Sequence, residues 1–346
     1  MDVTPLRFKG GNLEILDQTR LPREEVWLTL ETREDVWEAI HWLKVRGAPA
    51  IGVAAAYGLF VAVRYLEETD KDAFIAAFRE TRDYLNSSRP TAVNLSWALE
   101  RMEACLEAQR HRTVAQIKEA LLAEAQAIHR EDEEACRKLG ENGLSLLSPG
   151  MGLLTHCNAG ALAASRYGTA LAPIHLGQSM GYGFKVFAGE TRPLLQGARL
   201  TAWELQKAGV DVTLICDNMA ASVMKNGWVD AVLTGCDRLA ANGDGANKIG
   251  TSGLAILAKE FGVPFYMFVP TSTIDRNAAT GADIPIEQRR GDEVHRLWYA
   301  RDMAPAGIGV YNPAFDVTEA KYITAIVTER GIVRPPYEEG LRELFG

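Results

Sequence analysis

Short apolar runs recur after Pro149, and segments with helical periodicity separate most of them. A run of four to eight apolar residues is typical of a strand that is buried on both faces. Strands that alternate with helices form βαβ units, which build a parallel, doubly wound sheet. The apolar runs cover residues 152–155, 185–188, 211–215, 231–234 and 264–269, and the helical segments cover residues 195–207, 218–226 and 247–261. This part of the chain therefore predicts a Rossmann-like domain.

The earlier part of the chain has a different pattern. Residues 6–20 predict a short strand-forming start, and helical periodicity follows at 32–45, 51–66, 72–85, 92–109 and 113–139, with Gly140 as the expected helix end. The uncharged run 47–63 is shorter than the about 20 residues that cross a bilayer, and it predicts a close-packed core helix. We predict an α/β protein with a mainly helical N-terminal domain at residues 1–145 and a Rossmann-like domain, a doubly wound parallel sheet, at residues 146–346.

Composition narrows the classes of function. The 346 residues are 47% hydrophobic and carry a net charge of −8, which argues against a general nucleic-acid binder. The five cysteines form no C-x-x-C pair and no zinc-type spacing, so we expect a cytoplasmic protein without a metal. No secretory signal and no membrane partner are expected from the sequence. The run Gly181-Tyr-Gly-Phe184 precedes a predicted strand, whereas a dinucleotide fingerprint follows one, so we expect no nicotinamide cofactor.

The stretch 234–251 carries the clearest functional pattern. Asp237 comes just after the apolar run 231–234, and a loop with Gly243 and Gly245 leads to a predicted helix whose first turn would hold Asn247 and Lys248. Ligands of open α/β sheets bind at the carboxyl ends of the strands, and helix N-termini favour anions. An acid beside an anion site predicts catalysis on a phosphorylated small molecule.

Three other turns carry candidate site residues, and taken alone each has a plainer interpretation. Arg46, Gly47 and Ala48 join two predicted helices and could bind an anion, or could form a tight turn with a solvated arginine. Arg89 lies in another turn between helices, where a surface arginine is the simpler reading. Cys157 follows the apolar run 152–155 at the same sheet edge as the predicted acid, although free cysteines are more often core residues.

Several of these segments occur together in one order along the chain. They resemble the methylthioribose-1-phosphate isomerase family of methionine salvage, whose superfamily includes regulatory subunits of the translation-initiation guanine-nucleotide exchange factor. The resemblance spans nearly the whole chain and implies a helical domain, a Rossmann-like domain and a homodimer. The segments are residues 46–52, 89–95, 155–160, 190–193 with 196–199, and 234–251.

The resemblance also implies roles for individual residues. Cys157 and Asp237 would be the catalytic pair. Cys236 stands where relatives commonly carry a small residue such as alanine, and we expect it to be a bystander. Substrate binding, chiefly of a phosphate, would fall to Arg46, Gly47, Ala48, Arg89, Gln196, Asn247 and Lys248.

The implied reaction converts 5-methylthioribose 1-phosphate to 5-methylthioribulose 1-phosphate. The phosphate blocks spontaneous ring opening, so an acid must protonate the ring oxygen. Asp237 suits this role if an apolar setting raises its pKa. Hydrogen then moves from C2 to C1, either as a proton carried by Cys157 or as a hydride with Cys157 stabilising the transition state.

Two alternatives follow from the same resemblance. A related isomerase would act on ribose 1,5-bisphosphate or 5-deoxyribose 1-phosphate, and the pocket for the C5 substituent would decide between these sugars. A non-catalytic regulatory subunit would bind a sugar phosphate or a nucleotide together with a protein partner. The presence of both Cys157 and Asp237 favours the enzyme.

Overall fold

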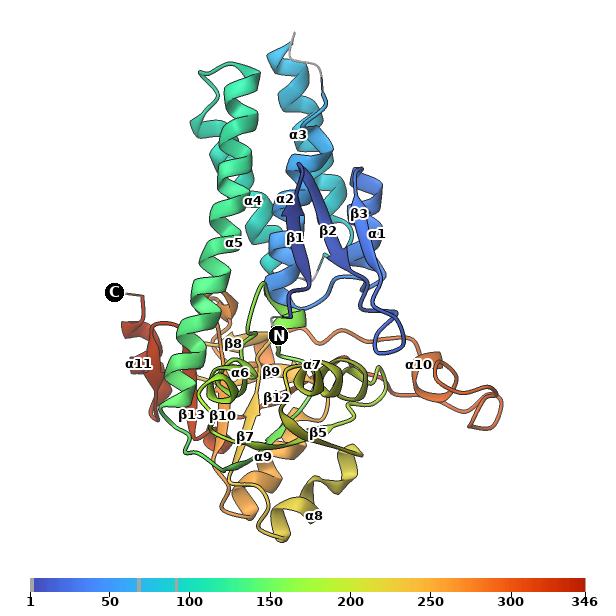
Figure 1. The fold of residues 1–346 in the computed structure, drawn as a ribbon, viewed down its shortest axis with the longest axis vertical. Helices are drawn as coiled ribbons and strands as arrows, with labels where there is room; N and C mark the ends of the chain where they lie inside the picture. The colour runs from blue at the N-terminus through green and yellow to red at the C-terminus, as the bar shows by residue number, and fades with distance from the viewer. Residues whose placement is uncertain (1–2, 67–69, 91–92, 346) are drawn as a thin grey trace. The chain divides into compact units, whose positions relative to one another are not determined.

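The computed structural model describes residues 3–66, 70–90 and 93–345, and it divides into two compact units (Figure 1). Unit 1 contains the described residues up to Arg137 together with Gly160–Gly168. Unit 2 contains Lys138–Ala159 and the described residues from Thr169 onward. The chain therefore leaves unit 1 inside a helix and returns to it once, for nine residues after the first strand of the large sheet.

Unit 1 begins with the strand-forming segment that the sequence predicts. Strands β1 (Leu6–Lys9), β2 (Asn12–Leu16) and β3 (Trp27–Leu30) form an antiparallel sheet in the order β1-β2-β3. Leu13 and Ile15 are fully buried while Asn12 and Glu14, which alternate with them along β2, are not, as expected for a sheet with one face on a core.

The helices of unit 1 agree closely with the periodicity of the sequence. Thr32 caps the first helix, because its hydroxyl accepts the N–H of Asp35 and the Asp35 carboxylate accepts the N–H of Thr32. Ala92, where the sequence predicts the start of a helix, lies outside the described residues, as does Thr91. The helices are α1 (Arg33–His41), α2 (Ala48–Val63), α3 (Lys71–Asn86), α4 (Val93–Ala108) and the first part of α5 (Val114–Leu144).

Helix α2 is the uncharged helix that the sequence predicts, and it forms the core of unit 1. Every residue of α2 except Ala48, Pro49 and Ala62 is buried. A Cβ atom on Gly58 would lie 2.5 Å from the Val36 side chain, so glycine allows α1 and α2 to approach closely. None of the described helices is both long and apolar enough to span a membrane.

Unit 2 contains a sheet of seven strands in the order β14-β13-β10-β7-β4-β5-β6, and all but β14 run parallel. The five predicted apolar runs are β4, β5, β6, β7 and β10, while the sequence did not predict β13 and β14. The strands are β4 (Gly152–Thr155), β5 (Lys185–Gly189), β6 (Asp211–Ile215), β7 (Ala231–Thr234), β10 (Phe265–Phe268), β13 (Ala325–Thr328) and β14 (Gly331–Val333).

The chain builds this sheet outward in both directions from its centre. It runs from β4 through β5 to β6 on one side, and then from β7 through β10 to β13 on the other. The direction of winding therefore reverses between β4 and β7. In open α/β sheets the ligand crevice lies at this reversal, beyond the carboxyl ends of the strands.

Helices accompany the strands of unit 2, and one expected helix end is wrong. Helix α5 does not stop at Gly140 but continues to Leu144. A Cβ on Gly140 would lie 2.6 Å from the Leu176 side chain, so this glycine serves close packing rather than termination. The other helices are α6 (Ala172–Ser179), a π-helical turn (Gly197–Thr201) that leads into α7 (Ala202–Lys207), α8 (Ala220–Lys225), α9 (Thr251–Glu260), α10 (Asp292–His295) and α11 (Tyr337–Glu343).

A smaller sheet of four strands corrects the sequence prediction for residues 247–250. Asn247 and Lys248 do not begin a helix. They end strand β9, which pairs antiparallel with β8 and β12. Helix α9 begins only after Gly250, whose φ is 103°. The strands are β11 (Ile274–Asp275), β8 (Arg238–Ala240), β9 (Gly245–Lys248) and β12 (Phe315–Thr318), in the order β11-β8-β9-β12.

Candidate active site

Cys157 and Asp237 follow neighbouring parallel strands at the point where the winding of the sheet reverses. Cys157 comes two residues after β4, and Asp237 comes three residues after β7. The two strands pair in register, with Thr155 opposite Leu233. Both residues therefore lie at the carboxyl edge of the sheet, where the sequence placed them.

Two threonines hold the backbone of Cys157. The residue adopts the left-handed conformation with a φ of 63°, which is uncommon for a residue other than glycine. Its N–H donates to Oγ1 of Thr191 at 2.8 Å, and its carbonyl oxygen accepts from Oγ1 of Thr201 at 2.6 Å. These two bonds fix the direction in which the Cys157 side chain leaves the chain.

Thr191 belongs to the loop after β5, and this loop is itself held in an unusual conformation. Thr191 and Leu195 both have positive φ, at 66° and 57°. With Cys157 they account for three of the five non-glycine residues with positive φ among the described residues. The Asp217 carboxylate, which follows β6, accepts the N–H of Thr191 at 2.8 Å and that of Arg192 at 2.7 Å. Such clustering of strained backbone is typical of functional sites.

Gln196 follows this loop, immediately before the π-helical turn, and has an unused acceptor. Only 8% of the residue is exposed, and its buried Oε1 has no hydrogen-bond partner among the described residues. The next residue must be glycine, because a Cβ on Gly197 would lie 1.7 Å from the carbonyl oxygen of Gly189. An unpaired buried amide oxygen is costly, and this one has its acceptor capacity unused.

Asp237 is exposed, which is contrary to the enclosed apolar setting that the sequence suggested. Its N–H donates to the carbonyl oxygen of Ala246 at 3.0 Å, and Leu239 and Ala240 beyond it are fully buried. Burial raises the pKa of the neighbouring Cys236 thiol, which donates to the same carbonyl at 3.6 Å. Cys236 is thus a protonated thiol with a structural hydrogen bond, in keeping with a bystander.

The predicted anion site at the start of α9 is wrong, because the protein fills it with its own carboxylate. Oδ2 of Asp316 accepts the N–H of Gly250 at 2.8 Å, and Oδ1 accepts the N–H of Ser252 at 3.1 Å. Asn247 and Lys248 face other partners. The Asn247 amide donates to Thr251 Oγ1 at 3.0 Å, and Lys248 Nζ donates to the Ala314 carbonyl at 2.8 Å.

His156 joins the end of β4 to the turn before α9. Its buried ring donates from Nε2 to the carbonyl oxygen of Ile249 at 2.8 Å, and its Nδ1 lies 3.7 Å from Oδ1 of Asp217. Burial lowers the pKa of His156, so the ring is neutral near pH 7 and its proton lies on Nε2. The residue next to Cys157 therefore connects it to the segment that carries Lys248.

The remaining predicted binding residues lie in unit 1. Gly47 is the N-cap residue of α2 with a φ of 92°, and a Cβ there would lie 2.3 Å from the carbonyl oxygen of Ala163, so only glycine fits. Ala48 is the first residue of the helix. Arg89 follows α3 in a turn where Nδ1 of His41 lies 3.1 Å from the Ser88 carbonyl. Of the nine predicted site residues, Arg46, Gly47, Ala48 and Arg89 belong to unit 1 and the other five to unit 2.

A model of the initiation factor 2 subunit family matches residues 44–335, which include all nine predicted site residues. The chain belongs to this family. The resemblance inferred from its motifs is thereby confirmed.

Individual members of the family share most of their length with this chain. A methylthioribose-1-phosphate isomerase of Symbiobacterium thermophilum is 66% identical over 336 residues, covering 97% of this chain and 94% of the relative. A 5-deoxyribose 1-phosphate isomerase of Petrotoga mobilis is 60% identical and covers 100% of both chains. The crystal structure of 5-methylthioribose 1-phosphate isomerase from Pyrococcus horikoshii has a TM-score of 0.94 at 43% identity, covering 99% of this chain and 95% of that one.

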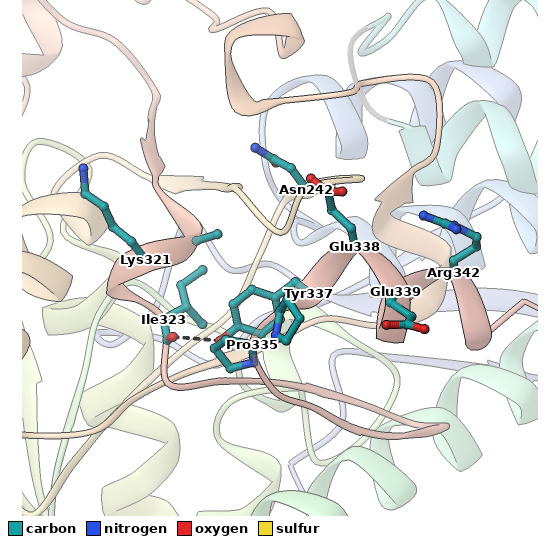
Figure 2. Close-up of a pocket in the computed structure, with 10 residues that line it drawn as sticks. Asn242, Lys321, Ile323, Pro335, Tyr337, Glu338, Glu339 and Arg342 are labelled. Atoms are coloured by element: carbon teal, nitrogen blue, oxygen red, sulfur yellow. Dashed lines mark hydrogen bonds between the residues drawn. The ribbon is translucent and has the colours of Figure 1, made fainter.

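The structure also contains a pocket that is separate from the predicted site residues. It has a volume of about 720 Å³ and lies between the 320–323 segment, the turn at Asn242 and the start of α11. Figure 2 shows Tyr337 in its wall, with the hydroxyl donating to the Ile323 carbonyl. None of the nine predicted residues lines this pocket, and its Lys321 already pairs with Glu319 at 2.6 Å. Among the residues that the structure describes, no group of three or more His, Cys, Asp or Glu is arranged to hold a metal ion.

Proposed function

We propose that the chain is an aldose–ketose isomerase of sugar 1-phosphates and that 5-methylthioribose 1-phosphate is its principal substrate. The observation that carries the proposal is the placement of Cys157 and Asp237 after neighbouring strands β4 and β7, where the sheet reverses its winding. Relatives at 66% and 60% identity carry the names of two sugar 1-phosphate isomerases, which supports the reaction class.

In the proposed mechanism Asp237 acts twice. As an acid it gives its proton to the ring oxygen while the bond between that oxygen and C1 breaks. As the resulting carboxylate it takes the proton of the C2 hydroxyl while the ketone forms at C2. The hydrogen on C2 passes to C1, so the substrate is oxidised at C2 and reduced at C1 with no external redox partner.

Cys157 assists the transfer of that hydrogen by one of two routes. As a thiolate it removes the C2 proton and returns it to C1, or it stabilises a direct hydride shift. Substrate deuterated at C2 distinguishes the routes. Full washout of deuterium into solvent excludes the hydride route, and complete retention at C1 supports it.

The proposed binding residues supply cations, amide groups and backbone N–H groups for the phosphate and the sugar hydroxyls. The buried Oε1 of Gln196 suits a sugar hydroxyl, because an amide oxygen accepts what a hydroxyl donates. Lys248 can turn its ammonium from the Ala314 carbonyl to a phosphate oxygen. Arg46 and Arg89, with the N–H groups of Gly47 and Ala48, are the proposed phosphate ligands of unit 1.

The choice among substrates is open to a direct test. The relatives carry the names of both 5-methylthioribose and 5-deoxyribose 1-phosphate isomerases. We therefore compare kcat/KM for these two sugars and for ribose 1,5-bisphosphate. The proposal expects the highest value for the methylthio sugar, and a higher value for either of the others would replace it as the principal substrate.

A regulatory subunit is the second candidate, and the family itself motivates it. The crystal structure of translation initiation factor eIF-2B subunit delta from A. fulgidus has a TM-score of 0.91 at 41% identity. An isomerase assay on the wild type and on Asp237→Asn separates the candidates. Activity in the wild type that is lost in the variant supports the enzyme, and absence of activity in both supports the binding protein.

We also propose that the protein is a cytoplasmic homodimer, and that an arm formed by residues 287–311 contributes to the interface. Backbone hydrogen bonds between Arg289 and Asn312 and between Ala314 and Glu287 close the base of the arm. Figure 1 shows the orange loop around α10 extending away from the sheet of unit 2. The residues 303–311 at its end include no charged side chain.

The surface of this arm fits a second copy of the chain. Of the 17 large hydrophobic residues that are exposed in the described chain, seven lie within residues 297–311. Together they present on the order of 700 Å² of apolar surface, close to the about 800 Å² that each partner contributes to a standard interface. The arm carries four arginines and four acidic residues, whereas the whole chain has a net charge of −8. A neutral arm meets its own copy without repulsion.

A further inference from the structure

We propose that Thr191 is a positioning residue for Cys157, and that Asp217 in turn positions Thr191. The inference rests on the proposed function, in which the Cys157 thiol assists hydrogen transfer. It concerns a residue that the sequence motif contains but to which neither the motif nor the comparisons assign a role.

The first observation is the bond between the two residues. The Thr191 hydroxyl accepts the N–H of Cys157 at 2.8 Å and donates to the Gly189 carbonyl at 3.1 Å. Thr191 is fully buried, so water does not replace these bonds. The hydroxyl therefore spans the ends of β4 and β5 and fixes the backbone that carries the thiol.

The second observation is the conformation of Thr191 itself. A β-branched residue at a φ of 66° is strained. Glycine or asparagine would adopt this backbone more easily, so a tight turn alone does not explain a threonine. Unlike glycine and asparagine, threonine has a hydroxyl group, and its restricted χ1 angle keeps this hydroxyl next to the Cys157 N–H.

The third observation is that a residue outside the loop, Asp217, stabilises the strained conformation of Thr191. The two oxygens of Asp217 accept the N–H groups of Thr191 and Arg192. Asp217 also faces His156, whose other nitrogen donates to Ile249. The Asp217 carboxylate thus fixes the Thr191 loop. It also lies next to the His156 ring, which connects the Cys157 segment to the turn before α9.

The consequence is a thiol whose place is set before substrate arrives. Reacting atoms must lie within about 3–3.5 Å of one another, and a displacement of about 1 Å can lower a rate by about 100-fold. A threonine hydroxyl that holds the Cys157 backbone contributes to kcat rather than to substrate affinity. It does so without touching the substrate.

The test compares Thr191→Val with Thr191→Ser. Valine keeps the shape, the β-branching and the strain, but it cannot accept the Cys157 N–H. Serine keeps the acceptor. Thr328→Val is the matched control, because Thr328 is equally buried in the same unit, also donates to a backbone carbonyl, at Gly331, and accepts a backbone N–H, from Arg330.

Two readouts are used. In the isomerase assay we expect Thr191→Val to lower kcat by about 30-fold with KM changed less than about threefold, while Thr191→Ser keeps at least about a third of the wild-type kcat. In the second readout, iodoacetamide alkylation of Cys157 is followed by peptide mass spectrometry against the partly exposed Cys105 of unit 1 on the same molecule. We expect the ratio of the two alkylation rates to change by more than about threefold in Thr191→Val alone.

The two readouts separate the inference from the proposed function. If Thr191→Val and Thr328→Val alter the alkylation ratio equally, or neither alters it, Thr191 does not position Cys157. If the ratio changes in Thr191→Val alone but the wild type isomerises none of the three sugars, the positioning role stands and the proposed reaction fails. An equal loss of kcat in the valine and serine variants also overturns the role.

Discussion

The carboxylate of Asp132 in α5 accepts the N–H of Ser165 at 2.7 Å, and both residues belong to unit 1. Burial raises the pKa of Asp132 to about 6. Between the unfolded pKa of about 3.8 and this value, the folded protein binds a proton that the unfolded chain has released. The contribution of Asp132 to stability is therefore greatest at low pH and decreases as pH rises through about 6.

Asp132→Asn tests this relationship, because the amide oxygen still accepts the Ser165 N–H. We expect the variant to gain up to about 2 kcal/mol relative to the wild type at pH 7.5 and little at pH 4. Urea unfolding across this pH range measures the difference. If the free energies of unfolding of the two proteins depended on pH in the same way, Asp132 would not have the raised pKa.

Gly47→Ala should destabilise the start of α2. The new Cβ would lie 2.3 Å from the Ala163 carbonyl oxygen at a residue with a φ of 92°. We expect a loss of about 2–4 kcal/mol in the free energy of unfolding, measured by denaturant. Gly150→Ala is the control, since its φ of 83° is similar but nothing lies within 4 Å of the Cβ, and it should cost only about 1 kcal/mol. Equal losses at both positions would show that the clash with Ala163 is absent.

The proposed catalytic pair should affect turnover without affecting the fold. Asp237→Asn and Cys157→Ser change one or two atoms each, and we expect each to lower kcat by at least about 1000-fold. Thermal unfolding should shift by less than about 4 °C. A variant that keeps more than about a tenth of the wild-type kcat would remove its residue from the proposed chemistry.

Gln196→Met removes the buried amide oxygen while it keeps the length of the side chain. We expect KM to rise about tenfold, because the side chain can no longer accept a ligand hydroxyl. Stability should stay the same or increase, since Oε1 has no partner among the described residues. A stable variant with an unchanged KM would remove Gln196 from the proposed binding set.

The arm should determine the oligomeric state. Tyr311 is 82% exposed, and we expect Tyr311→Asp together with Ile308→Asp to raise the dimer dissociation constant at least about 100-fold. Light scattering after size exclusion measures the mass. Met180→Asp is the control, because Met180 is also an exposed apolar residue of unit 2 but lies outside the arm. A monomeric wild type, or a variant that remains dimeric, would reject the interface.

Apolar patterning allowed the sequence to predict most of the fold. The runs that became β4 and β7 are buried on both faces and were detected as continuous apolar runs, although β13, which is buried in the same way, was missed. The same signal placed Cys157 and Asp237 at one edge. It did not reveal β8 or β12, because neither is a continuous apolar run: β8 begins with Arg238, and β12 contains Asp316 and Thr318.

The sequence did not predict the local backbone conformation of the site segments. The helical pattern after Lys248 extends backward through Asn247, and only Gly250 marks the true start of α9. Thr191 was part of a recognised motif, but nothing in its residue type predicts a positive φ. That conformation depends on Asp217, which lies 26 residues further along the chain.

The pairing of β9 with β12 sets Asn247 opposite Asp316 and Lys248 opposite Phe315. Consecutive side chains of a strand point to opposite faces of the sheet. The Asn247 amide and the Lys248 ammonium therefore lie on opposite faces although the two residues are neighbours in the chain. Inserting or deleting one residue in the turn between β8 and β9 would exchange the two faces and turn each group toward the other's surroundings. The length of this turn is therefore under tight constraint.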